Sequence, residues 1–499
     1  MSKSIWRKKP LAAYEADFQK SELRRVLGRW ALTSLGIGAV IGGGIFVLTG
    51  IAANEWAGPA LALSFVIAGI GCTFAALCYA EFASILPVEG SAYAYSYGTI
   101  GEFFAWFIGW NLILEYMMGA TTVAVSWSGY FEKLLGLFHI KPPFWLMNDP
   151  ITAREKVEKM VAAGQAVADY PFAINLPALL IVWVVTWVLV RGIKEAASTN
   201  NAIVIMKVAT VIFVIIAGAF FIDTANWTPF IPEPVFNIAD GKNHYGFDGI
   251  VTAAGIVFFA YIGFDAVSTQ AGEAINPKKD IPFAILASLI ICTILYIAVS
   301  LVLTGMVHYT QLDLKAPVAA AFESAGLGWA VYIITIAAVA GLTSVMLVMM
   351  LSQTRIFLGM AKDGLLPRSM FGAIHPKFKT PHRSTILVGA IVSIVAAVTP
   401  IDKVSEMTSM GTLLAFAMIC GAVLLLRVRH PEIERPYRAP LLYIVAPLGV
   451  GFNIWLMTSL RHQTWTAFFT WATIGIIVYF AYSYRHSNLH KDALAKEQG

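Results

Sequence analysis

Long apolar runs alternate with short polar stretches along almost the whole chain. A helix needs about 20 predominantly apolar residues to cross the hydrocarbon core of a bilayer. Twelve runs come close to that length, so the pattern predicts twelve transmembrane helices and an all-α integral membrane protein. The runs cover 31–53, 60–86, 103–130, 175–192, 201–222, 248–271, 283–306, 329–359, 384–400, 404–427, 440–461 and 464–484.

The composition agrees with a chain that is solvated mainly by lipid. Hydrophobic residues make up 58% of the 499 residues and charged residues only 13%, which is far from the balance of soluble domains. The basic first stretch lacks the apolar core and cleavage site of a secretory signal. We therefore expect a cytoplasmic N-terminal segment at 1–30, a transmembrane domain at 31–484 and a cytoplasmic tail at 485–499.

Basic residues are unequally divided between the two faces of the predicted bundle. An even number of helices puts both chain ends on one face, and most of the 35 Lys and Arg lie on that face. Cytoplasmic loops of membrane proteins carry this excess. We therefore expect cytoplasmic termini in a plasma membrane, which in a bacterium is the inner membrane. The net charge of +5 then needs no nucleic-acid partner.

The sequence offers no motif for covalent chemistry. All four cysteines fall in apolar runs, without the spacing of a disulfide framework or a metal site. No HExxH, GxSxG or Walker motif is present. We expect neither an enzyme nor a bound metal or cofactor. The longest predicted loop, 131–174, is helix-compatible around Glu155–Ala168 and is expected to form an external cap.

Glycines interrupt two predicted helices near mid-membrane. The first helix reads GIGAVIGGGIF at Gly36–Phe46, and the sixth reads GIVFFAYIGFDA at Gly255–Ala266. Interrupted helices at matching positions in two halves are typical of inverted-repeat transporters, because unwound turns free backbone groups to hold a polar solute. We expect the repeats at about 31–222 and 248–427, with two further helices outside them.

Three consecutive glycines, Gly42, Gly43 and Gly44, are the strongest local signal. Each costs about 1 kcal/mol relative to alanine inside a helix, so bare backbone must serve a purpose there. An unwound turn would present free N–H groups and a partial positive charge suited to a carboxylate. Close helix packing is the alternative, since Gly38 and Gly42 form a small-xxx-small pair. The matching interruption in the sixth helix favours a binding site.

Aromatic residues surround the interruption of the sixth helix. Phe258, Phe259 and Tyr261 can close over a solute, while freed carbonyls between Phe259 and Gly263 accept hydrogen bonds from an ammonium group. Taken singly, each of these aromatic residues is better explained by packing. Together with the glycine run, they favour a zwitterionic ligand such as an amino acid.

Three ionisable residues lie inside apolar runs, where charge is costly and usually functional. Lys207 lies about six residues from the cytoplasmic end of its run. It either snorkels to the interface or lies in the bundle as a titratable group in place of a bound cation. Glu115 pairs with a buried cation, contacts a basic substrate side chain or lines a water-filled cavity. Asp265 needs a partner, a path for water or a proton.

Several motifs resemble the amino acid–polyamine–organocation superfamily, and most closely its cationic amino acid transporter branch. They are GIGAVIGGGIFVLTG, YAEFASILPVEGSAYAYSYGTIGE, FFAYIGFDAVSTQAGEAINPKKDIP and QTRIFLGMAKDGLLP…HPKFKTP. The resemblance covers nearly the whole chain. It implies the leucine-transporter fold, which has five plus five inverted helices and here two more, and it implies alternating access.

The resemblance also implies a substrate site made of backbone groups. The N–H groups of Gly42, Gly43 and Gly44 would bind the substrate carboxylate. The carbonyls of Val40, Phe259 and Ile262 would bind its ammonium group, with Ile41 and Ala260 beside them. Relatives often carry Ser or Thr where this chain has Gly43, so a hydroxyl contact to the carboxylate is missing here.

Two further residues take roles from the same resemblance. Phe259 would gate the site. Lys207 would replace the sodium ion of related carriers, which implies proton-coupled or sodium-independent transport. As a separate hypothesis, the small residues Ala337, Ala338 and Gly341 in the eighth run leave room around the substrate side chain.

A secondary amino acid transporter is therefore the predicted function, driven by a proton gradient or by exchange. Its partners would be the amino acid, protons and membrane lipids. A polyamine or amine carrier is the rival within transport, but it would need acidic residues in place of a carboxylate site. An amino acid receptor or channel on the same fold is the alternative from another class.

Overall fold

The fold is a bundle of long helices, and it confirms the predicted all-α membrane class. The computed structural model describes residues 5–10, 27–85, 91–162, 172–192, 196–237, 241–268 and 274–491. Within them, eight helices are long and apolar enough to cross a membrane. Two shorter apolar helices, Leu176–Arg191 and His382–Val398, accompany these eight.

The first part of the bundle contains the interrupted first helix and four continuous ones. Its elements are α2 (Arg29–Val40), η1 (Gly44–Leu48), α3 (Thr49–Ala52), η2 (Ala53–Ala57), η3 (Gly58–Ala60), α4 (Leu61–Ile85), α5 (Ser91–Thr99), α6 (Glu102–Leu137), η4 (Phe144–Leu146), α7 (Pro150–Ala162), α8 (Leu176–Arg191) and α9 (Ala196–Ala219).

The second part begins with a small hairpin and then repeats the pattern of an interrupted helix followed by continuous ones. Its elements are η5 (Thr224–Trp227), β1 (Val235–Asn237), β2 (Lys242–His244), α10 (Gly246–Val257), η6 (Phe258–Tyr261), α11 (Pro277–Met306), η8 (Tyr309–Gln311), α12 (Pro317–Ser324), α13 (Gly328–Lys362), α14 (Arg368–Phe371), α15 (His382–Val398), α16 (Ile401–Arg429), α17 (Leu442–Ser459), α18 (His462–Val478), η9 (Tyr479–Ser483) and α19 (Tyr484–His486). Strands β1 and β2 pair antiparallel, with Val235 opposite His244.

The predicted helix ends need several corrections. Helix α2 begins at Arg29, inside the segment expected to precede the membrane domain. The sixth run does not continue as a helix to 271, because Ile262 is extended after η6; positions 269–271 lie outside the described residues. The external helix expected at Glu155–Ala168 is α7, which begins at Pro150 and ends at Ala162. Positions 163–168 also lie outside the described residues.

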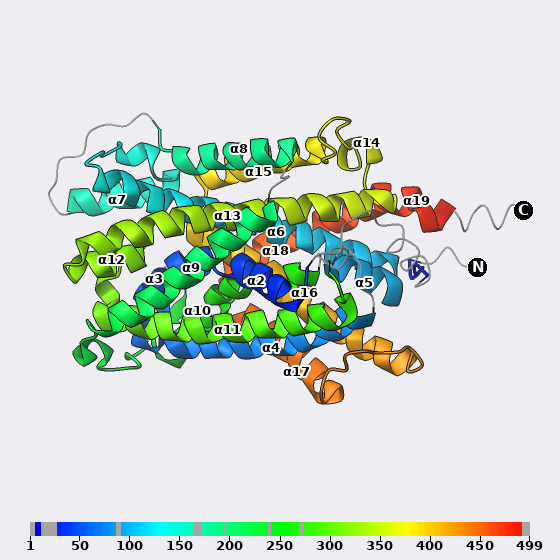
Figure 1. The fold of residues 1–499 in the computed structure, drawn as a ribbon, viewed down its shortest axis with the longest axis horizontal. Helices are drawn as coiled ribbons and strands as arrows, with labels where there is room; N and C mark the ends of the chain where they lie inside the picture. The colour runs from blue at the N-terminus through cyan, green and yellow to red at the C-terminus, as the bar shows by residue number, and fades with distance from the viewer. Residues whose placement is uncertain are drawn as a thin grey trace, which may run out of the picture.

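Corresponding helices of the two parts have similar lengths. Helices α2 and α10 have 12 residues each, α6 and α13 have 36 and 35, and α8 and α15 have 16 and 17. Helix α4 packs against α11, α6 against α13 and α8 against α15. Figure 1 shows α4 beside α11 and α8 beside α15 along the length of the bundle.

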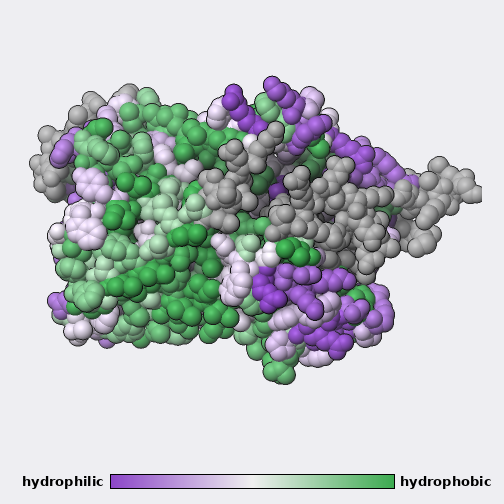
Figure 2. Space-filling view, viewed as in Figure 1, coloured by the Kyte–Doolittle hydropathy of each residue, from purple (hydrophilic) through white to green (hydrophobic). Residues whose placement is uncertain are grey.

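The outer surface is apolar along the bundle and hydrophilic toward one end. Isoleucines on α9 and α11, such as Ile216 and Ile294, expose about 60% of their surface (59% and 62%), as expected of side chains in lipid. In Figure 2, hydrophilic side chains gather toward the end that carries α14 and α19. The two terminal segments meet at this end, where Glu102 N–H donates to Arg7 O and the Glu102 side chain accepts from Ser487.

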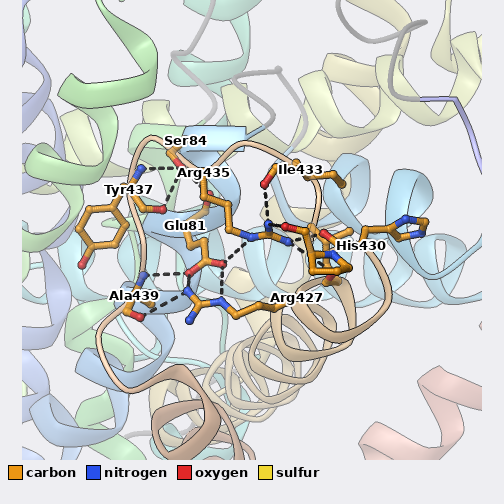
Figure 3. Close-up of polar contacts among 10 residues, drawn as sticks. Glu81, Ser84, Arg427, His430, Ile433, Arg435, Tyr437 and Ala439 are labelled. Atoms are coloured by element: carbon orange, nitrogen blue, oxygen red, sulfur yellow. Dashed lines mark hydrogen bonds and ion pairs between the residues drawn. The ribbon is translucent and has the colours of Figure 1, made fainter.

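A buried ion cluster ties α4 to the turn between α16 and α17 (Figure 3). Arg427 donates from Nε to Glu81 Oε1 at 3.2 Å and from Nη2 to Oε2. Arg435 places Nε 3.3 Å from Glu81 Oε1, and the N–H of Ala439 donates to Oε2 at 2.8 Å. Arg435 also donates to the carbonyls of Ile433 and His430. One carboxylate therefore organises the whole 430–439 turn.

Candidate functional site

The first interrupted helix opens immediately before the glycine run. Helix α2 ends at Val40 because Ile41 is extended, with φ −72° and ψ 100°. Ile41 N–H still donates to Ile37 O, and the next such bond runs from Phe46 N–H to Gly42 O. A helix that restarts after an unwound turn has N–H groups without intrahelical partners. The predicted interruption of the first helix is confirmed.

The second interrupted helix opens at Ile262 and Gly263. After η6, Ile262 takes an extended conformation with ψ 132°. Gly263 has φ +121°, which side-chain-bearing residues rarely adopt. A Cβ on Gly263 would lie 2.8 Å from the carbonyl carbon of Ala39 in α2. Glycine is therefore required here both for the turn and for the close approach of the other interrupted helix.

The two interruptions lie side by side. A Cβ on Gly44 would lie 2.4 Å from Ala260 Cα, so backbone meets backbone at this point. Tyr296 of α11 places its hydroxyl 2.8 Å from Val40 O and 2.9 Å from Ala260 O. A hydroxyl carries one proton, so it donates to only one of these carbonyls at a time. Tyr296 thus bridges both unwound segments.

The glycine run also packs closely against neighbouring helices. A Cβ on Gly42 would lie 3.1 Å from the Val345 side chain of α13. A Cβ on Gly43 would lie 2.7 Å from Ser126 Oγ of α6. The packing interpretation of the glycine run therefore has direct support. It does not exclude a binding site, because the helix is unwound immediately before these glycines.

Lys207 reaches the first interruption from α9. Its side chain is fully buried, and Nζ donates to Gly38 O at 2.7 Å. The interfacial alternative is therefore wrong: this lysine lies inside the bundle. A Cβ on Gly341 would lie 3.1 Å from Lys207 Cε, so the space beside Gly341 is filled by the lysine. The expectation that Gly341 makes room for the substrate side chain is wrong for that reason.

Asp265 has the partner that its depth requires. Tyr116 of α6 donates its hydroxyl to Asp265 Oδ2 at 3.0 Å, and Gly263 N–H donates to Oδ1 at 3.2 Å. The carboxylate thereby fixes the unwound turn of the sixth helix against α6.

Glu115 is the opposite case. Its side chain is fully buried, and neither carboxylate oxygen accepts a hydrogen bond from any residue that the structure describes. Thr412 of α16 lies nearby, but its hydroxyl donates to Thr408 O at 3.0 Å. A fully buried carboxylate without a described hydrogen bond favours a positively charged partner.

The other expected residues are buried around the two interruptions. Phe259 is 4% exposed, and its carbonyl accepts a hydrogen bond from Ile262 N–H at 3.1 Å. The carbonyl of Phe259 therefore has one internal donor, and the carbonyl of Val40 shares the Tyr296 hydroxyl with Ala260 O. A carbonyl oxygen has two lone pairs, so both carbonyls can accept a further hydrogen bond. Ala337 is buried on α13. On that helix, Val345 lies nearest to Gly42 and Leu342 lies close to Gly43.

Several residues at this site were missed by the sequence analysis. The tyrosines among them carried a usable signal, since a hydroxyl in an apolar run needs a hydrogen-bond partner. Leu342 and Val345 carried none, because they are indistinguishable from other packing residues. The missed residues are Tyr116, Ser126, Tyr130, whose hydroxyl donates to Phe46 O, Tyr296, Leu342 and Val345.

Known proteins resemble this chain over nearly its whole length. A family model described as amino acid permease matches residues 27–481. The chain belongs to this family. The predicted family is thereby confirmed, and the protein is a multi-pass membrane permease rather than an enzyme.

Individual relatives within the family differ in their substrates. A methylthioribose transporter and a branched-chain amino acid permease, both of Bacillus subtilis (strain 168), are each 42% identical to this chain. Each alignment covers 98% of this chain and 100% of the relative. A vacuolar cationic amino acid transporter of Arabidopsis thaliana is 36% identical over 82% of this chain and 64% of its own length.

Proposed function

We propose that this protein carries amino acids across a membrane by alternating access. The observation that carries the proposal is the pair of interrupted helices, held together by Tyr296 across Val40 O and Ala260 O. Backbone N–H groups of Gly42, Gly43 and Gly44 would bind the carboxylate. Carbonyls with a spare lone pair, on Val40, Phe259 and Ile262, would bind the ammonium group.

Two inverted repeats, at about 31–222 and 248–427, would generate this arrangement. The similar lengths of corresponding helices support the division, and so does the packing of α4 on α11, α6 on α13 and α8 on α15. Repeats of opposite orientation bring their first helices together at mid-membrane, where a solute can be reached from either side.

Lys207 would take the place of a bound cation and so make transport independent of sodium. The lysine donates to Gly38 O, one turn before the interruption. Loss or gain of its proton would change a contact on the helix that must move, which couples transport to protons. The charge distribution supports cytoplasmic termini. The two bacterial relatives support a bacterial inner membrane.

The substrate class follows from the groups that the site offers. Backbone N–H and C=O groups at adjacent unwound turns suit a zwitterion, whereas methylthioribose has neither carboxylate nor ammonium. The 42% identity to a methylthioribose transporter nevertheless makes that thio-sugar the second candidate. A polyamine would leave the N–H groups of the glycine run without a partner, although the buried Glu115 would suit its charge.

Uptake into proteoliposomes tests the proposal. We would measure labelled arginine, lysine, leucine, alanine and methylthioribose, with and without an inward proton gradient and without sodium, for the wild type and Lys207→Ala. We expect gradient-driven uptake of at least one amino acid. Removal of the lysine amine leaves Gly38 O without its donor, so we expect uptake by Lys207→Ala to fall about tenfold or more.

The other outcomes separate the alternatives. Uptake that requires amino acid inside the vesicles, with or without a gradient, indicates an exchanger. Binding without flux indicates a receptor, and uptake of methylthioribose alone replaces the proposed substrate. Lys278, on the exposed start of α11, provides a matched Lys→Ala control that should transport as the wild type does.

A further inference from the structure

Ser126 presents a buried hydroxyl to the glycine run. It lies on α6, is 1% exposed, and its Oγ would be 2.7 Å from a Cβ on Gly43. Tyr130, one turn further along α6, donates to Phe46 O on the same interrupted helix. Residues four apart share a helix face, so this face of α6 is directed at η1.

The hydroxyl of Ser126 has no partner among the residues that the structure describes. The neighbouring hydroxyls on α6 all have one. Thr121 and Thr122 donate to backbone carbonyls one turn earlier, at 2.8 and 2.9 Å, and Ser128 donates to Asn175. The same backbone bond would ordinarily be open to Ser126. Its hydroxyl instead points away from its own helix and toward Gly43.

An unpartnered buried hydroxyl is unfavourable unless something else supplies the hydrogen bond. The Ser126 hydroxyl faces the unwound turn that precedes the helical stretch Gly44–Ala57. Groups there are hydrogen-bond donors: the N–H groups of the turn and the Ser126 hydroxyl. Several donors that lie close together fit an anionic group of the solute.

We propose that Ser126 is a substrate-binding residue whose hydroxyl donates a hydrogen bond to the carboxylate of the bound amino acid. The inference rests on the proposed function, and it names a side chain for a site otherwise made of backbone. It also accounts for Gly43: the hydroxyl that a side chain at 43 would bring is delivered from α6, and Ser126 fills the space that such a side chain would need.

The test exchanges the two positions. The probe is the best transported amino acid of leucine, arginine and alanine, with its amide as competitor. Ser126→Ala should raise the KM for the amino acid about tenfold through loss of one charge-assisted hydrogen bond, with little change in the maximal rate. Gly43→Ser alone should transport poorly, because its Cβ would meet Ser126 Oγ. The double variant Gly43→Ser with Ser126→Ala should recover most of the lost affinity.

The amide of the amino acid, used as a competitor, tests whether Ser126 contacts the carboxylate of the substrate. It carries no negative charge, so Ser126→Ala should change its inhibition constant by less than about twofold, well short of the tenfold effect on the acid. Ser128→Ala is the matched control, because it removes a hydroxyl of the same helix that faces Asn175. Its KM should equal that of the wild type.

Three results would overturn the inference. They are an unchanged KM in Ser126→Ala, an equal rise in Ser128→Ala, or an equal loss for acid and amide. Failure of the double variant to recover affinity would also overturn it, because a hydroxyl at position 43 would then not replace the one at Ser126. If the wild type takes up no amino acid, the proposed function fails and this inference with it, whereas normal uptake by Ser126→Ala removes this inference alone.

Discussion

Glu81 and Glu115 are buried to the same degree, at 1% and 0% exposure, but their surroundings are opposite. Glu81 accepts hydrogen bonds from Arg427 and from Ala439 N–H, and Arg435 lies beside it. Glu115 accepts none from the described residues. The first lies at the end of the bundle where the two terminal segments meet, and the second lies in the middle of α6.

The difference separates structural carboxylates from functional ones. A buried ion pair is tolerable when every oxygen and N–H has a partner. A buried carboxylate without partners lowers stability, and such groups in membrane spans usually mark a path for protons or solute. Glu81 accordingly has a structural role in the 430–439 turn, whereas we propose that Glu115 belongs to the transport site or its approaches.

Replacement of Glu81 should have the largest effect on stability. Glu81→Met leaves Arg435, whose side chain is 3% exposed, without a counter-charge. Breaking a buried pair in this way costs about 3–5 kcal/mol. We expect a corresponding fall in the thermal unfolding temperature of the purified protein in detergent. Glu158→Met, which breaks an exposed pair with Arg154, should cost less than about 0.5 kcal/mol.

If Glu81→Met unfolded at the same temperature as the wild type, the distinction between Glu81 and Glu115 would be contradicted. This result would mean that the cluster in Figure 3 is dispensable and that Arg427 and Arg435 find other acceptors.

The architecture could be predicted because long apolar runs leave few alternatives. Backbone groups cannot stay unpaired in lipid, so each run must be a helix, and the interruptions at Gly42 and Gly263 follow from residues that weaken a helix. The ends were less predictable, since polar residues extend several helices beyond the membrane, as in α6 and α13.

The site could be predicted only where the signal was local. A lysine or aspartate in an apolar run is visible in the sequence, but its partner is not. Lys207 meets Gly38 O across 169 positions, and Tyr116 meets Asp265 across 149. The Glu81 cluster was missed for the same reason, because its arginines lie about 350 residues away in the sequence.

Removal of the donor to Asp265 should have an intermediate effect. Tyr116→Phe keeps the ring but removes the hydroxyl that donates to Asp265. The described donors that remain are backbone N–H groups: that of Gly263 at 3.2 Å and those of Asp265 and Ala266. A hydrogen bond to a charged group contributes about 1.5–3 kcal/mol, so the unfolding free energy should fall by about that amount. Tyr443→Phe, at a 62% exposed tyrosine, is the control and should unfold as the wild type does.

Equal unfolding of Tyr116→Phe and the wild type would mean that Asp265, like Glu115, does not depend on a hydrogen bond from a neighbouring helix. The unwound turn of the sixth helix would then be held by Tyr296 and the Gly263 backbone rather than by α6.

Replacement of Glu115 should have the smallest effect on stability and a large one on transport. Glu115→Met removes a carboxylate that makes no described hydrogen bond and substitutes an apolar chain of similar length. The cost of burying the polar group disappears, so we expect the unfolding free energy to stay within about 1 kcal/mol of the wild type. Uptake in proteoliposomes should fall about tenfold or more.

Because Glu81→Met is the same chemical change at equal burial, the two variants form a matched pair. A loss of stability in Glu115→Met as large as in Glu81→Met would show that Glu115 has a strong partner in the folded protein, and the distinction between the two carboxylates would no longer hold.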